Sequence, residues 1–172
     1  MPLRSVPALS TIDFETTAFQ QLNARVELPQ QLVPRAEGTR FNVTLTLEEE
    51  VVESRSFVLV RNDSDRASAM AQPTVAPGRQ SYTFSLAPAD QLSLEDIRRK
   101  MLEAKAAERT GSLALAVAVT DVCAKGDLPD GPLLVDVYLK TSETERFVRT
   151  LDGYDLRELQ SGELADLPIC SN

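Results

Sequence analysis

The stretch RFNVTLTLE, residues 40–48, carries the clearest strand signal in this chain. Phe41, Val43, Leu45 and Leu47 would line one face of a strand, and the polar residues between them would face solvent. β-Branched and aromatic residues fit a pleated, half-buried surface, so composition and alternation agree. The pattern predicts a β-strand with one face on a hydrophobic core.

The same alternation recurs on both sides of this stretch and predicts a chain made mostly of short strands. Residues 112–122 are expected to be the most buried strand, with Leu and Val on one face and alanines on the other, where a helix would pack. The other predicted strands are 11–14, 21–28, 55–61, 80–86, 133–140 and 145–151, the last two forming a hairpin.

One long helix is predicted at about 94–109. Ser93 is a suitable N-cap residue, and Leu94, Ile97 and Met101 recur at helical spacing. A short second helix is expected near 155–160. No other part of the chain alternates strand and helix in the βαβ rhythm of a parallel sheet.

Together these elements predict an all-β fold, a β-sandwich that is immunoglobulin-like or transthyretin-like in outline, with one inserted α-helix. The 172 residues suit a single domain over 11–172, preceded by a flexible lead-in over 1–10. Aromatic residues make up only 5% of the chain and Trp is absent, so the core must rest on Val, Leu and Ala.

Two cysteines and the absence of histidine shape the functional expectation. Cys123 directly follows the predicted buried strand, and Cys170 lies two residues from the C-terminus, where a disulfide would attach the tail to the fold. The alternative is two free thiols in a cytosolic protein. Lack of histidine removes the commonest general base and the commonest metal ligand, which favours a non-catalytic domain.

Charge and the N-terminal sequence bear on partners and location. A net charge of −8 argues against a nucleic-acid partner, because phosphate binding needs clustered Lys and Arg. Residues 1–9 lack the apolar region of a signal peptide. The chain is therefore cytosolic, or a leader has been removed. The cysteines favour the second alternative, a periplasmic or extracellular protein, and the Pro-flanked start would suit a tether after a lipidated residue.

Acidic loops supply a candidate calcium site. Asp63, Asp65, Asp127 and Asp130 offer the hard oxygen ligands that calcium takes from loops, although their spacing does not match the EF-hand pattern. Aspartate is also a common turn residue, so turn formation is the competing interpretation. The same loops could bind a glycan.

Two regions are candidate partner-binding surfaces. The long loop over 62–79 contains Met70 and Val75, and a connector without a binding role is the competing interpretation. Arg98, Arg99 and Lys105 form a basic helix face in an acidic protein, which a solvated amphipathic helix would also show.

The sequence thus predicts a non-catalytic accessory or assembly component of the cell envelope that binds another envelope protein through strand edges or loops. No cofactor is expected, and a membrane would be contacted only through an N-terminal lipid anchor. The alternatives are a glycan- or calcium-binding domain, and a hydrolase that uses two carboxylates.

Overall fold

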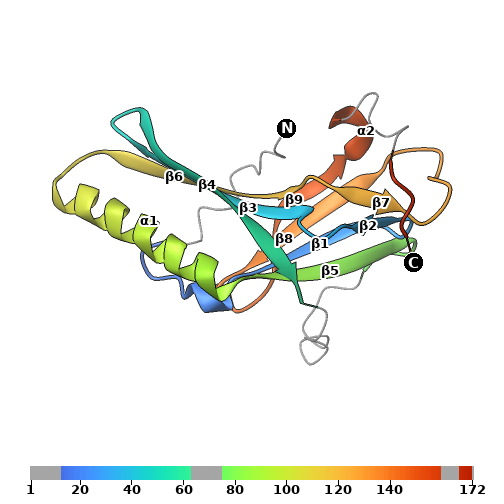
Figure 1. The fold of residues 1–172 in the computed structure, drawn as a ribbon, viewed down its shortest axis with the longest axis horizontal. Helices are drawn as coiled ribbons and strands as arrows, with labels where there is room; N and C mark the ends of the chain where they lie inside the picture. Colours follow the sequence, from blue (N-terminus) through green and yellow to red (C-terminus); the bar gives the residue numbers. More distant parts are fainter. Residues whose placement is uncertain (1–12, 63–74, 160–166, 172) are drawn as a thin grey trace.

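The computed structural model describes residues 13–62, 75–159 and 167–171 (Figure 1). The fold is mostly β, with one helix of 19 residues. A curled antiparallel sheet has the strand order β6-β3-β4-β5-β1-β8-β9, and β2 and β7 form a second, two-stranded sheet. The strands are β1 Asn23–Pro29, β2 Leu32–Pro34, β3 Thr39–Leu47, β4 Glu50–Arg61, β5 Arg79–Leu86, β6 Gly111–Val119, β7 Val122–Ala124, β8 Leu134–Lys140 and β9 Val148–Asp155. The helical segments are η2 Phe19–Gln21, α1 Pro88–Ala106 and α2 Leu156–Leu159.

The predicted class, mostly β with one inserted helix, is confirmed. The strand pairing gives a half-barrel with a two-stranded sheet beside it, which is not clearly a sandwich. The physical reason is that the large sheet curls around the apolar side chains of its own strands. Its core is completed by α1 through Leu94 and Ile97, both fully buried.

Strand β1 lies at the centre of one half of the sheet, between β5 and β8. Ala24, Val26 and Leu28 belong to the hydrophobic core, and the side chains between them, Arg25 and Glu27, are also buried. β1 is therefore buried on both faces. The expectation that residues 112–122 form the most buried strand is wrong, because β6 lies at the end of the strand order and its first half is largely exposed.

The sheet divides into two arms that meet at β4 and β5 (Figure 1). The first arm, β6-β3-β4, extends beside α1, and the second arm is β5-β1-β8-β9. The arms are joined by pairing of only Leu59–Arg61 in β4 with residues 84–86 in β5. Among the described residues, this short junction leaves most of β4 without a strand partner on that side.

Helix α1 begins six residues earlier than predicted, at Pro88 instead of Leu94. Proline is well suited to the first helical position, because its ring presets φ and its missing N–H would have no helical partner there. Ser93 therefore lies inside the helix and is not its cap. The predicted apolar stripe is retained, but α1 packs against the leucine-bearing face of β3 and β6, and Ala114 on the alanine face is exposed.

The predicted disulfide between Cys123 and Cys170 is confirmed. Cys123 lies in β7, and the backbone N–H of Cys170 donates to the carbonyl of Ala124 at 2.9 Å. Ile169 forms a parallel bridge with Ala124. The Ile169 side chain, expected to fold in beside Cys123, is 81% exposed because the bridge turns it outward.

Other predicted strands agree with β1, β3, β5, β8 and β9 within a few residues, including the β8–β9 hairpin. The predicted strand at 11–14 is wrong for its described part, because Asp13 starts a turn and its carbonyl accepts from the N–H groups of Thr16 and Thr17. The predicted lead-in over 1–10 lies outside the described residues. In the described ranges, neither α1 nor α2 is long and apolar enough to cross a membrane.

Candidate partner-binding edge

The most distinctive surface feature is one open side of β4. On one side, residues 50–58 of β4 pair with β3. On the other side, β4 pairs with β5 only from Leu59 onward. Within the described residues, the stretch 50–58 therefore has one side without a strand partner, and we call it the docking edge.

The direction of the backbone N–H and C=O groups alternates along a strand, so one known hydrogen bond identifies which groups of the docking edge face outward. The N–H of Asn62 donates to the carbonyl of Thr83 at 2.8 Å, so Asn62 points its backbone groups toward the β5 side. Backbone direction alternates along a strand, and pairing with β3 runs without a break from Val58 to Glu53. Ser54 and Ser56 therefore point their N–H and C=O groups away from β3.

A second hydrogen bond, at the start of β3, leads to the same assignment of outward-facing groups. The N–H of Thr120 donates to the carbonyl of Gly38 at 2.7 Å, so even-numbered residues of β3 face β6 and odd-numbered ones face β4. Phe41 pairs with Phe57, which makes the odd-numbered residues of β4 those that bond β3. From Glu53 to Val58 the even-numbered residues are therefore left for the open side, and the extra residue Val52 reverses this order at Val51 and Glu50.

A groove runs between the start of β4 and the C-terminal half of α1. Its volume is about 380 Å³. Both apolar and charged side chains line it. We call it the edge groove, and it is lined by Leu47, Val52, Glu53, Lys100, Glu103, Ala104, Ala107 and Arg109.

Ion pairs fix the charges on the wall of the edge groove. The Lys100 Nζ lies 2.7 Å from Glu53 Oε2 and 3.2 Å from Asp96 Oδ2. Hydrogen bonds from Lys100 and then Arg55 lower the pKa of the Glu53 carboxyl, and the same contact with Glu53 raises the pKa of Lys100. The wall therefore remains charged but internally neutralised at neutral pH.

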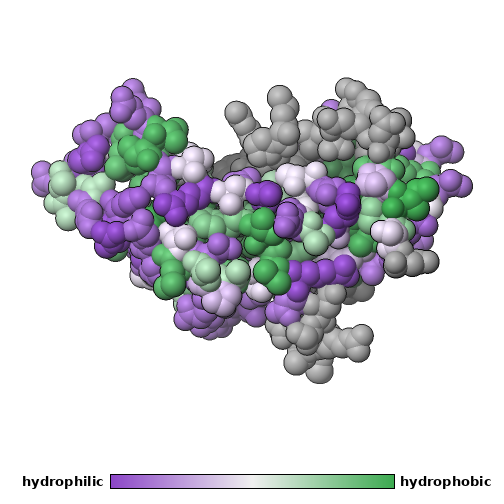
Figure 2. All heavy atoms as spheres, in the orientation of Figure 1, coloured by the Kyte–Doolittle hydropathy of each residue, from purple (hydrophilic) through white to green (hydrophobic). Residues whose placement is uncertain are grey.

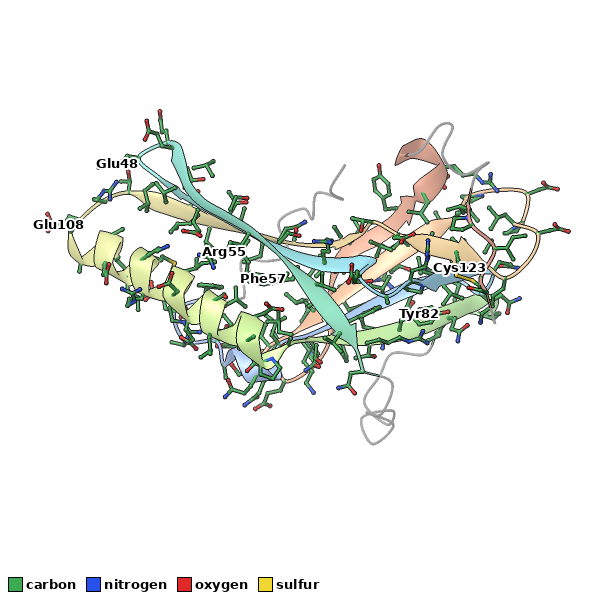
Figure 3. All side chains as sticks on the ribbon, in the orientation of Figure 1. Glu48, Arg55, Phe57, Tyr82, Glu108 and Cys123 are labelled. Carbon is green, nitrogen blue, oxygen red and sulfur yellow. A yellow bond between two sulfur atoms is a disulfide. The ribbon has the colours of Figure 1, made fainter. Side chains whose placement is uncertain are left out.

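Exposed apolar side chains lie at the open end of the first arm. Val51 is 63% exposed and Val52 is 46% exposed, next to the acidic tip Glu48–Glu50. Figure 2 shows hydrophobic atoms among hydrophilic ones at this end of the molecule. Figure 3 labels Glu48 and Arg55 along the same arm, with Phe57 nearer the centre.

The predicted basic face of α1 divides in the structure. The Arg98 Nε donates to the carbonyl of Phe14 at 2.9 Å, and its guanidinium lies 4.1 Å from the centre of the Phe19 ring. Arg98 thus attaches the N-terminal turn to α1. Lys105 contacts Glu15 on the same side, with its Nζ at 2.5 Å from Oε1.

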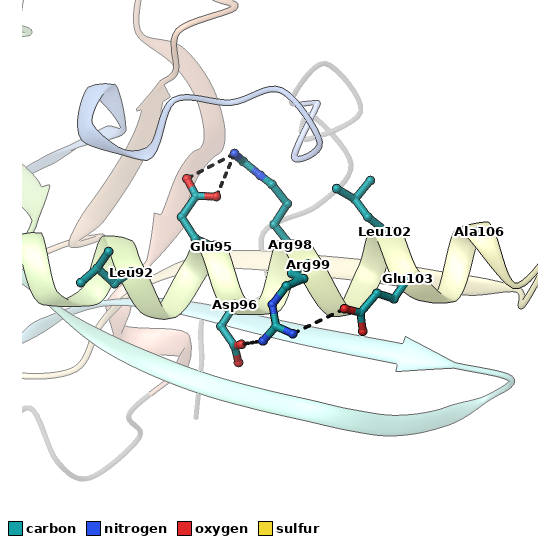
Figure 4. Close-up of a pocket in the computed structure, with 8 residues that line it drawn as sticks. All are labelled: Leu92, Glu95, Asp96, Arg98, Arg99, Leu102, Glu103 and Ala106. Atoms are coloured by element: carbon teal, nitrogen blue, oxygen red, sulfur yellow. Dashed lines mark hydrogen bonds and ion pairs between the residues drawn. The ribbon is translucent and has the colours of Figure 1, made fainter.

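Arg99 lies on the outer face of α1, where it pairs with Asp96 and Glu103 of the same helix (Figure 4). A shallow hollow on this face also includes Leu92, which is 74% exposed, and Leu102. All its lining residues belong to one helix, so it is a surface of α1 and not a site built between elements.

The remaining predicted site residues are not brought together. Val75 is partly buried, and Met70 lies outside the described residues. Asp127 and Asp130 are exposed, and Asp63 and Asp65 lie outside the described ranges. Across the described part of the chain, no three His, Cys, Asp or Glu side chains are placed to hold a metal ion.

Sequence reasoning missed the docking edge because its signal is weak. The predicted strand began at Arg55, whereas β4 begins at Glu50. Residues 50–56 are mostly exposed on both faces and so show no alternation of apolar and polar residues. The cue that was present is the β-branched pair Val51-Val52 directly after the glutamate turn.

Comparison of this chain with protein-family models, with curated proteins and with solved structures found no match.

Proposed function

We propose that this chain is a non-catalytic domain of the cell envelope that binds a protein segment as an added strand along the docking edge. The observation that carries the proposal is the open side of β4 over residues 50–58. An extended peptide can pair with such an edge through main-chain hydrogen bonds, while its alternate side chains enter pockets beside it.

The edge groove supports the proposal because it lies where such side chains would go. Glu53 projects toward Lys100 of α1, so this face of β4 is the one that meets the helix. A strand added beside Ser54 and Ser56 would place alternate side chains on that same face. Leu47, Val52 and Ala104 offer them apolar contacts.

The disulfide supports the location outside the cytoplasm. Disulfides persist in oxidising compartments and are rare where thiols are kept reduced. Cys123 and Cys170 join the tail to β7, as expected of a structural bridge. We therefore propose a periplasmic or extracellular protein, with a lipid anchor as one way to hold it at a membrane.

The test compares two substitutions of one residue. Ser56→Pro removes the outward N–H of the docking edge and leaves the ladder to β3 intact, because Ser56 does not donate to β3. Proline is tolerated on strands where the N–H faces solvent. Ser56→Ala keeps the N–H and serves as the matched control.

Peptides selected from a random displayed library on the wild-type protein are the probe. We expect them to bind the Ser56→Ala variant as they bind wild type and to lose most affinity for Ser56→Pro. Unfolding curves of both variants confirm that the fold is intact. Equal binding to the two variants would show that the peptide does not add to β4, and the proposal would fail.

A further inference from the structure

We infer that the segment received by the docking edge is β4 of a second copy of this chain, paired antiparallel about a two-fold axis at Ser54. This inference rests on the proposed function, because it needs β4 to be a docking edge. It names the partner and the register. A symmetric contact of this kind uses the same surface on both copies.

Charge is complementary in that register. With Ser54 opposite Ser54, Glu53 lies opposite Arg55 of the second copy, and Arg55 lies opposite its Glu53. Oppositely charged residues directly across a strand pair stabilise it, and like charges destabilise it. Shifting the centre by one residue would place the two Arg55 side chains opposite each other.

Arg55 is the side chain that would move in this exchange, because Glu53 is mostly buried and also contacts Lys100 of its own chain. In the single chain, the Arg55 Nε lies 2.6 Å from Glu53 Oε1, and the Arg55 side chain is 40% exposed. Both side chains lie on the same face of β4, because they are two residues apart in a strand. In the pair of copies, each Arg55 would turn from its own Glu53 to that of the other copy.

The length of the docking edge also favours a two-fold axis at Ser54. The open stretch runs from Glu50 to Val58, and Ser54 is its middle residue. In this register the hairpin tip of the second copy lies near Val58, so the tip ends close to where β5 begins to pair. A register shifted toward β5 would drive the tip into that strand, and the opposite shift would leave part of the edge uncovered.

The surroundings of the edge fit a second copy. Helix α1 packs over β3 and β6 and contacts β4 through Lys100 and Glu53, and among the described residues no strand pairs with the open side of residues 50–58. The acidic tip Glu48–Glu50 of the second copy would reach the end of β5, where α1 starts without a side-chain cap at Ala87. Carboxylates are favourable near a helix N-terminus.

A register irregularity between Leu45 and Thr46 makes Val52 an extra residue in β4. Bulges bend a strand and interrupt its ladder. Regular pairing between copies is therefore centred on residues 53–55, where the charge pairs lie. A short ladder of this kind predicts a weak, concentration-dependent dimer.

The experiment uses charge reversal and mixing. Analytical ultracentrifugation over a concentration series should show wild type in a monomer–dimer equilibrium. Glu53→Arg or Arg55→Glu alone creates two like-charge pairs, and each should lower the association constant at least about fivefold. A one-to-one mixture of the two variants should associate, because each chain then meets opposite charges. The double variant Glu53→Arg/Arg55→Glu should also recover dimerisation.

Two results would overturn the inference. Wild type that is monomeric at every concentration would exclude the second copy as the partner, and a dimer unaffected by the single reversals would exclude this register.

Peptide binding separates these failures from failure of the docking edge. A monomer whose library peptides still depend on Ser56 retains the edge but not the self-pairing, whereas peptides indifferent to Ser56→Pro would overturn both.

Discussion

At the scale of single residues, Arg25 is the most demanding side chain in the molecule. It is fully buried on β1, and its Nη2 bonds the carboxylate of Glu27. Its Nε and Nη1 have no hydrogen-bond partner among the described residues, although the guanidinium lies 4.5 Å from the centre of the Tyr138 ring. Burying a charge costs free energy that a single ion pair does not fully repay.

We expect Arg25→Met to lower the free energy of unfolding by about 3–5 kcal/mol, because it leaves the buried Glu27 carboxylate without its main partner. The double variant Arg25→Met/Glu27→Met should lose much less, since it removes both charges and leaves Arg79 paired with Asp136. Urea unfolding of the two variants measures the difference. A double variant as unstable as the single one would contradict this account.

Lys100 contributes to how stability responds to acid. The pKa of Glu53 is lowered from its ordinary 4.5, first by Lys100, and that of Asp96 is lowered from 3.8, first by Arg99 and then by Lys100. A carboxyl with a lowered pKa adds stability above its unfolded pKa and loses it as the pH falls through its folded pKa. The stabilisation is therefore complete near pH 7 and declines below about pH 4.5.

The variant Lys100→Met should thus have a lower melting temperature than wild type at pH 7 and a smaller decrease between pH 5 and acid, about pH 2–3. Melting curves across this range measure both slopes. Arg99→Met separates the two carboxyls, because Arg99 contacts Asp96 but not Glu53 and should reduce only the Asp96 part of the decrease. Parallel curves for wild type and Lys100→Met would show that the Glu53 contact does not form in solution.

At the scale of elements, helix α1 is held by a few fully buried side chains. We expect Ile97→Ala to lower the free energy of unfolding by about 2–5 kcal/mol, because the side chain is 0% exposed and its loss leaves a cavity. Leu92→Ala on the outer face is the control, and a change within about 0.5 kcal/mol is expected. Denaturant unfolding distinguishes the two. Equal losses would mean that α1 packs differently.

The elements also show how far sequence reasoning reaches. Strand β3 was predicted almost to the residue, since its alternation is a local signal that burial of one face directly produces. The inner stripe of α1 was predicted for the same reason, but its start was not, because Ser93 is as good a cap signal as Pro88. The docking edge could not be predicted, because a strand is open or paired according to what distant segments do.

At the scale of the whole molecule, the disulfide closes a long loop over the last third of the chain. Its two cysteines are 47 positions apart. We expect Cys123→Ala/Cys170→Ala to lower the free energy of unfolding by about 4 kcal/mol, the chain-entropy value for such a loop. Chemical unfolding of oxidised wild type and the double variant measures it. Unchanged stability would mean that the tail is held in place without the bond.

The arrangement of the strands into two arms could not be predicted from local sequence patterns. Strands predicted singly were mostly right, yet the expected sandwich assumed two facing sheets. The order β6-β3-β4-β5-β1-β8-β9 instead joins both arms in one sheet. The short pairing of Leu59–Arg61 with β5 joins the two arms into one sheet, and no pattern in those residues predicts this pairing.

The central place of β1 has a kinetic consequence. Val26 of β1 pairs with Tyr82 on one side and with Val137 on the other. β1 is therefore synthesised before either of the strands that it pairs with, which come from the middle and the end of the chain. Closing such large loops before any contact is gained slows folding. Half of the sheet therefore forms only after nearly the whole polypeptide is available.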